Sequence, residues 1–126
     1  QVIDMSDISN ENFQICAINT EINGTLTSIV SIYCTRFVIN GRIWSQIMSR
    51  LSPTFIIAGD FNAHSMVWGC DFSDVHGDHI LEAVDTYNMA ILNDGKPTII
   101  SPPGYRKSAV DLTLCSINLA ANIKTV

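Results

Sequence analysis

A carboxylate, an amide and an imidazole follow directly on the apolar run FIIAG of residues 55–59, at Asp60, Asn62 and His64. A carboxylate ligates a hard cation such as Mg²⁺ or orients a water molecule. An amide can hydrogen-bond a phosphoryl oxygen without adding a repulsive charge. These side chains therefore indicate a site for a cation and an anionic substrate. The alternative is a purely local role, because Asp and Asn both close turns well.

Two further side chains that can do chemistry lie in apolar segments. Asp111 interrupts SAVDLTLCS, residues 108–116, and a carboxylate inside a buried strand needs a hydrogen bond or a charged partner. Tyr33 ends SIVSIYC, residues 28–34, where its hydroxyl would reach a phosphate. A tyrosine at a strand end more often packs in the core with its hydroxyl in water.

The segment before Asp60, residues 54–58, has the length and apolar composition of a short buried strand. In α/β proteins, ligands usually meet the polar groups that follow the carboxyl end of such a strand. Gly59 permits a sharp turn at this point. We expect the alternation of residues 60–62 to aim Asp60 and Asn62 the same way, while Phe61 anchors the loop.

A hairpin is predicted from Phe13 onward, because the dipeptide Asn23-Gly24 supplies the positive φ angles of a two-residue turn. One face of this hairpin is entirely apolar and carries Phe13, Ile15, Ala17, Val30, Ile32 and Cys34. Tyr33 lies on the other face. The same register sets Cys16 opposite Ser31, which argues against a disulfide bond between Cys16 and Cys34.

Apolar spacing predicts two helices and further strands. The first helix lies between Ile39 and Leu51 and ends before Pro53, and the second runs from Asp78 to Tyr87. Short strands are expected near residues 90–92, 98–101 and 109–115. This mixture of strands and helices along the chain predicts an α/β fold.

The composition limits the class of protein. The 126 residues are 47% hydrophobic and 15% charged, which suits one globular core. The apolar runs are far shorter than the roughly 18 residues that span a bilayer, and no basic start precedes an apolar block. We therefore expect an intracellular chain with no secretion signal and no membrane partner. Four cysteines without C-x-x-C spacing favour reduced thiols.

The net charge of −5 argues against a basic nucleic-acid-binding surface. A nucleic-acid partner would need a bound cation or a locally positive surface to offset the repulsion. A metal-binding module is a further alternative, but its four candidate ligands, His64, Cys70, His76 and His79, fit no standard zinc spacing. We expect His76 and His79 to face solvent near the start of the second helix.

Four segments, in their order and spacing, resemble the endonuclease/exonuclease/phosphatase family: SIYC at 31–34, IIAGDFNAHSMVWG at 56–69, ILNDGKPT at 91–98 and SAVDLTLCS at 108–116. The likeness is greatest to the apurinic-type endonuclease domain of non-LTR retrotransposon polyproteins, particularly the insect kind. It covers nearly the whole chain from Phe13. It implies a DNase I-like four-layer α/β sandwich, in which two mixed β-sheets pack face to face with helices outside.

The resemblance also implies roles for single residues. Tyr33 matches the tyrosine that approaches the scissile phosphate, Asp60 the aspartate that positions or activates water, and Asn62 the amide that steadies it. Asp111 matches the aspartate in the strand before the family's catalytic histidine. We assign Ser108, which precedes that aspartate, and the loop residue His64 to substrate binding.

The reaction that the resemblance implies is hydrolysis of a phosphodiester bond in DNA with the help of Mg²⁺, or of Mn²⁺ in its place. The expected partners are DNA and a reverse transcriptase in the same polyprotein, and the expected place of action is the nucleus. Two alternatives stand beside this interpretation. The chain is a remnant that folds but does not cleave, or it is a phosphatase of the same fold.

The chain departs from the family pattern at both ends. No segment before Phe13 supplies the family's first catalytic asparagine or its metal-binding glutamate, and its closing serine, aspartate and histidine are not found before Val126. We therefore interpret residues 1–126 as a single partial domain, the middle and later part, whose main metal ligand is absent from this chain. We expect this fragment alone to be inactive. Thr35 and His76 stand where relatives often have proline and arginine.

Overall fold

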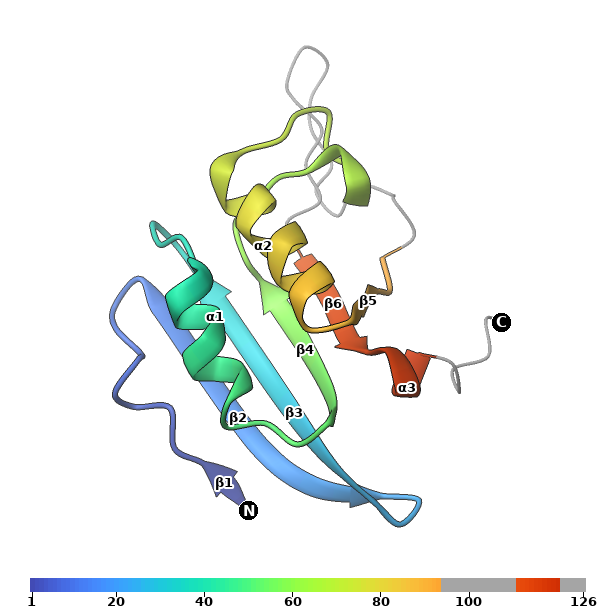
Figure 1. Cartoon of the computed structure of the whole chain (residues 1–126). Helices are drawn as coiled ribbons and strands as arrows, with labels where there is room; N and C mark the ends of the chain where they lie inside the picture. Colours follow the sequence, from blue (N-terminus) through green and yellow to red (C-terminus); the bar gives the residue numbers. More distant parts are fainter. Residues whose placement is uncertain (94–110, 121–126) are drawn as a thin grey trace.

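The computed structural model describes residues 1–93 and 111–120, which are built on one mixed β-sheet (Figure 1). Its strands are β1 (Val2–Ile3), β2 (Phe13–Ile22), β3 (Thr25–Cys34), β4 (Thr54–Asp60), β5 (Met89–Ile91) and β6 (Asp111–Ser116). Their order in the six-stranded sheet is β1-β2-β3-β4-β6-β5. β3 and β4 run parallel, and the other neighbouring pairs are antiparallel.

The predicted hairpin is confirmed residue by residue. β2 pairs with β3 so that Phe13 faces Cys34 and Cys16 faces Ser31. Asn23 and Gly24 turn the chain with φ angles of 50° and 80°, as a two-residue hairpin turn requires. The apolar face is buried along its length. Neither Cys16 nor Cys34 forms a disulfide bond.

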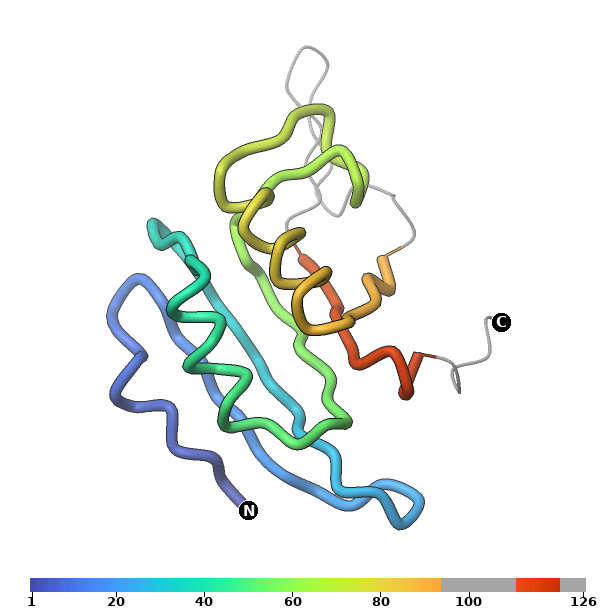
Figure 2. Tube along the Cα trace, viewed as in Figure 1, coloured from blue at the N-terminus to red at the C-terminus, as the bar shows by residue number. Residues whose placement is uncertain are grey.

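The helical elements are α1 (Gly41–Met48), the 3-10 helix η1 (Met66–Trp68), α2 (Val75–Thr86) and α3 (Ile117–Ala120). Figure 2 traces α1 as the crossover that returns the chain from β3 to the start of β4, as a parallel pair of strands requires. α1 lies within its predicted range, and the Asn40 side chain caps it by accepting the Ile43 N–H. In the described residues, no helix is long and apolar enough to cross a bilayer.

α2 begins at Val75, earlier than the predicted start at Asp78. The reason is Asp74, whose carboxylate accepts the backbone N–H of Gly77 at 2.8 Å and so caps the helix. A helix that starts here includes His76 in its first turn. The exposed fraction of His76 is only 4%, so our expectation that this residue faces solvent is wrong.

The core lies between the helices and one face of the sheet, and α1 and α2 cover that same face in Figure 1. Trp44 of α1 stacks over Phe61 with ring centroids 6.4 Å apart, and both side chains are fully buried. Burial of each such side chain contributes about 1.5 to 3 kcal/mol. Phe61 therefore anchors the chain directly after β4, as we expected.

The opposite face of the sheet carries exposed side chains, among them Cys16, Ile18 and Ser31. The described residues thus form one mixed sheet with helices on one side. This agrees with the α/β class that we expected, and the described residues contain one sheet where the resemblance implied two. The expected strand at 98–101 lies outside the described residues, as do positions 109 and 110 of the last one.

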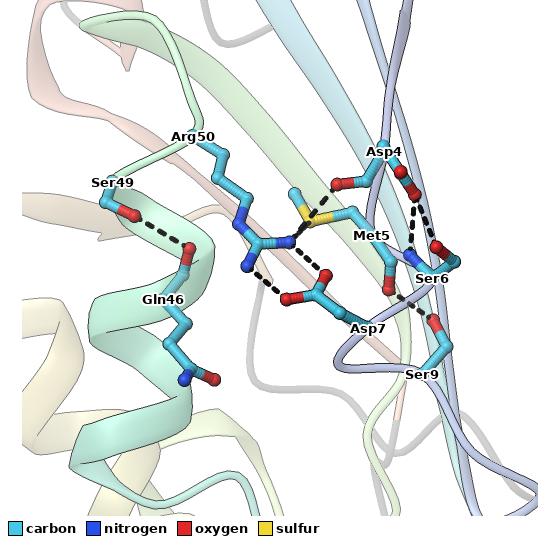
Figure 3. Close-up of polar contacts among 8 residues, drawn as sticks. All are labelled: Asp4, Met5, Ser6, Asp7, Ser9, Gln46, Ser49 and Arg50. Atoms are coloured by element: carbon cyan, nitrogen blue, oxygen red, sulfur yellow. Dashed lines mark hydrogen bonds and ion pairs between the residues drawn. The ribbon is translucent and has the colours of Figure 1, made fainter.

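The first residues of the chain are tied to the turn that follows α1 by a bidentate ion pair (Figure 3). Arg50 donates from Nη1 and Nη2 to the two carboxylate oxygens of Asp7, at 2.6 and 2.7 Å. It also donates to the Asp4 carbonyl at 3.2 Å. The hydrogen bond from Arg50 lowers the pKa of Asp7 below its ordinary value. The guanidinium of Arg50 therefore makes its contacts within the protein.

Candidate active site

Strand pairing places three of the candidate site residues in one row. Tyr33 at the end of β3 pairs with Asp60 at the end of β4, and Asp60 pairs with Asp111 at the start of β6. Residues paired in register point to the same face of a sheet. Tyr33, Asp60 and Asp111 therefore lie side by side across three strands, at one end of the sheet and on the face away from α1 and α2.

Asp111 differs from the expectation of a buried carboxylate in need of a partner. It is exposed, because it is the first residue of β6 and lies on the outer face of the sheet. Its neighbours Leu112 and Leu114 take the inner face, with exposed fractions of 1% and 0%. Tyr33 is also open to solvent, with an exposed fraction of 47%. The row is thus accessible to a ligand.

Asn62 does not continue the strand alternation that we expected. Its φ angle of 48° is left-handed, a conformation that asparagine tolerates well. Its backbone N–H donates to Asp60 Oδ1 at 2.9 Å, and its Nδ2 donates to the Thr35 carbonyl at 2.6 Å. Asn62 thus ties the segment after β4 to the segment after β3.

Gly59 allows β3 and β4 to approach closely beneath this row. Its φ angle is 154°, and a Cβ atom on Gly59 would lie 1.8 Å from the Ile32 carbonyl oxygen. No other residue type could occupy this position without moving the strands apart. Gly59 therefore sets the spacing between Tyr33 and Asp60.

His64 is held against the start of α2. Its Nδ1 lies 2.7 Å from Asp74 Oδ2, and its backbone N–H donates to Asp74 Oδ1 at 3.1 Å. Its ring stacks on Phe72 with centroids 4.4 Å apart. Burial raises the pKa of Asp74, but hydrogen bonds from Gly77 and His64 outweigh it, and the net pKa is lowered. Asp74 thus fixes both the helix start and the loop after Asn62.

His76 links α2 to the β3–α1 connection. Its Nε2 accepts the backbone N–H of Ile39 at 3.2 Å. Burial lowers the pKa of His76 to about 4, so the ring is neutral at pH 7 and its Nε2 remains an acceptor. Relatives often have an arginine at this position. In this chain His76 occupies it and makes a structural hydrogen bond to Ile39. The sequence feature that could have predicted the burial of His76 is the helix cap at Asp74, because a helix that begins there includes His76.

The alternative of a zinc-binding module finds no support in residues 1–93 and 111–120, where no three His, Cys, Asp or Glu side chains gather. His64 and His76 have separate partners, and the side chain of His79 is partly exposed. Ser108, the other substrate-binding candidate, lies outside the described residues.

The sequence profile of the endonuclease-reverse transcriptase family matches residues 27–126, a range that includes all of the candidate site residues. The chain belongs to this family. The endonuclease domain of TRAS1, a telomere-specific non-LTR retrotransposon, is similar in structure to this chain, with 27% sequence identity and a TM-score of 0.73. Among curated proteins, none matches the sequence significantly.

These findings confirm the family that the four sequence segments indicated, and with it the DNase I-like fold class. The alignment with the TRAS1 domain covers 99% of this chain and 59% of that one. The chain therefore spans less than two thirds of the length of that solved domain.

Proposed function

We propose that this chain is the middle and later part of an endonuclease domain that hydrolyses a phosphodiester bond in DNA and leaves a nick. The domain would serve a non-LTR retrotransposon polyprotein that also carries a reverse transcriptase and acts in the nucleus. The observation that carries the proposal is the row of Tyr33, Asp60 and Asp111 in a chain of this family.

The proposed role of Asp60 is to orient the attacking water and to accept its proton. Its carboxylate is held by the Asn62 N–H, so one oxygen is fixed and the water would be placed relative to it. Asn62 steadies this arrangement from the segment that it ties to Thr35. Tyr33 is exposed on the neighbouring strand, and its hydroxyl would contact the scissile phosphate.

Asp60 and Asp111 suit a divalent cation. Two carboxylates opposite each other on adjacent strands repel, and a cation between them would relieve that repulsion. Such an ion, Mg²⁺ or Mn²⁺, supplies charge stabilisation at the phosphoryl and leaving oxygens. Where the structure describes the chain, no third acidic or histidine ligand joins these two. We propose that the main ligand is a glutamate elsewhere in the domain.

The test compares the 126-residue chain with a protein that carries it within a complete domain. The complete domain should nick supercoiled DNA in Mg²⁺ and stop when EDTA is added. The chain by itself should show little nicking, because groups that act as a unit fail together rather than by increments.

Robust nicking by the 126-residue chain would contradict the proposal that the main metal ligand lies elsewhere in the domain. A complete domain that folds and binds DNA but never nicks it would favour the catalytically inactive remnant. Release of phosphate from small phosphate esters without nicking would favour a phosphatase.

A further inference from the structure

A hollow of about 350 Å³ lies beside the candidate active site. Its walls are residues 35–38 of the β3–α1 connection, Asn62 after β4, and residues 74–76 at the start of α2. We call it the flanking hollow. Its volume falls in the range of clefts that hold small ligands. Asn62 belongs both to this hollow and to the candidate active site.

Four polar side chains of the wall bond within the protein: Asn62 to Thr35, Thr35 to Asn12, His76 to Ile39 and Asp74 to His64. These contacts join the three segments of the wall. The shape of the hollow is therefore fixed before any ligand arrives, which reduces the entropy that binding would cost.

Beside the Asp74 carboxylate, which accepts the backbone N–H groups of His64 and Gly77, the flanking hollow offers a ligand one arginine and apolar surface. Arg36 is exposed, and the ion pairs among the described residues do not include it. Val38 and Val75 line the hollow with exposed fractions of 43% and 64%. A guanidinium beside apolar surface suits a ligand that joins a phosphate to a sugar and a flat ring.

The position of the hollow indicates which nucleotide it would take. Thr35 follows closely on Tyr33 along the chain, and Asn62 follows closely on Asp60. A strand with its scissile phosphate at that row would therefore run past the hollow. Asp60 and Asp111 repel phosphates at this end of the sheet, so a cation such as Arg36 would be needed beside them.

We propose that the flanking hollow binds the deoxynucleotide next to the scissile phosphodiester, an inference that rests on the proposed cleavage of DNA. Arg36 contacts a phosphate of that nucleotide, and its sugar and base lie against Val38 and Val75. The hollow is thus a substrate subsite that contributes to DNA affinity and to the choice of the nicked position.

The first test measures DNA affinity of the complete domain in EDTA, where no cleavage occurs. Arg36→Ala should weaken binding of a labelled duplex by about tenfold, as loss of a charge-assisted hydrogen bond does. The slope of log affinity against log salt should fall by about 0.9. Arg36→Lys should retain part of the DNA affinity and part of the salt slope that Arg36→Ala loses. The matched control is Arg42→Ala, which removes an exposed arginine outside the hollow and should have a much smaller effect.

The second test fills the hollow with a repulsive charge. Val75→Glu should weaken DNA binding at least about tenfold without changing the melting temperature, since Val75 is exposed. Val67→Glu adds the same charge at a valine of similar exposure, 62%, outside the hollow, and should weaken binding less.

Equal losses for Val75→Glu and Val67→Glu, or for Arg36→Ala and Arg42→Ala, would overturn the subsite. So would a complete domain with no measurable affinity for DNA. These outcomes are separate from the proposed activity, because binding is measured without cleavage. A domain that never nicks but shows the paired differences would keep the subsite and lose the activity.

Discussion

Asp60 lies between two strand partners, with Tyr33 on one side and Asp111 on the other, and its carboxylate accepts the N–H of Asn62. The types of these residues and their place at strand ends could be read from the sequence. The exposure of Asp111 and the left-handed φ of Asn62 could not, because they depend on strand register and on one backbone angle. Apolar residues on both sides of an aspartate in a strand do not show on which face of the sheet its carboxylate lies.

The burial of His76 was also not predicted from the sequence, and it gives a prediction at the residue scale. Its pKa is lowered from 6.5 to about 4 by burial, so the unfolded chain binds more protons than the folded one between these values. The contribution of neutral His76 to stability is therefore present above pH 6.5 and is lost as the pH falls towards 4. Melting temperatures of the domain should fall over this range.

The variant His76→Gln keeps an acceptor for the Ile39 N–H but does not titrate. It should be less stable than the parent protein at pH 7 and should lose less stability on acidification to pH 4. Parallel curves of melting temperature against pH for the two proteins would contradict the buried, neutral state of His76.

At the scale of secondary structure, local signals decided how much the sequence could predict. The Asn23-Gly24 turn fixed the hairpin register, and the periodic apolar residues of α1 predicted that helix. The start of α2 was not predicted because its first turn, Val75 to Asp78, contains a glycine and has no apolar periodicity, so that only the cap at Asp74 marks it. The hollow could not be predicted, since three separate segments build it.

Gly59 gives a prediction about the contact between β3 and β4. Gly59→Ala should destabilise the domain by at least about 2 kcal/mol or prevent folding, because the new Cβ meets the Ile32 carbonyl and the φ angle is strained. Gly41→Ala is the matched control, since no atom lies within 4 Å of a Cβ at Gly41. Denaturant unfolding of both variants checks this, and a mild effect of Gly59→Ala would mean that the strands can separate.

At the scale of the whole molecule, the sheet is covered by α1 and α2 on one face and carries exposed Cys16 and Ile18 on the other. Apolar side chains on an open sheet face are expected where another layer packs in a larger protein. The sequence resemblance implied such a layer, the second sheet of the sandwich. The TRAS1 domain, of which this chain covers 59%, has the length to include one.

Thiol labelling can test how open that face is. In the 126-residue chain, Cys16 should react quickly, whereas Cys34, Cys70 and Cys115 are buried and should react slowly. Burial also raises the pKa of the Cys34 thiol to about 12, which leaves little reactive thiolate. Cys16→Ser should remove the fast phase. In a complete domain the fast phase should slow, and an unchanged rate there would argue against a second layer over β2.

The most direct test of the account replaces the charge at Asp60 without changing the size of the side chain. Asp60→Asn in the complete domain should lower the nicking rate by about 10²- to 10⁴-fold, the usual cost of losing a positioned base. Its Oδ1 can still accept the Asn62 N–H, so melting temperature and DNA affinity should hardly change. The control Asp85→Asn removes an exposed carboxylate on α2 and should nick normally. Normal nicking by Asp60→Asn, or equal losses in both variants, would contradict the role of Asp60 in the reaction.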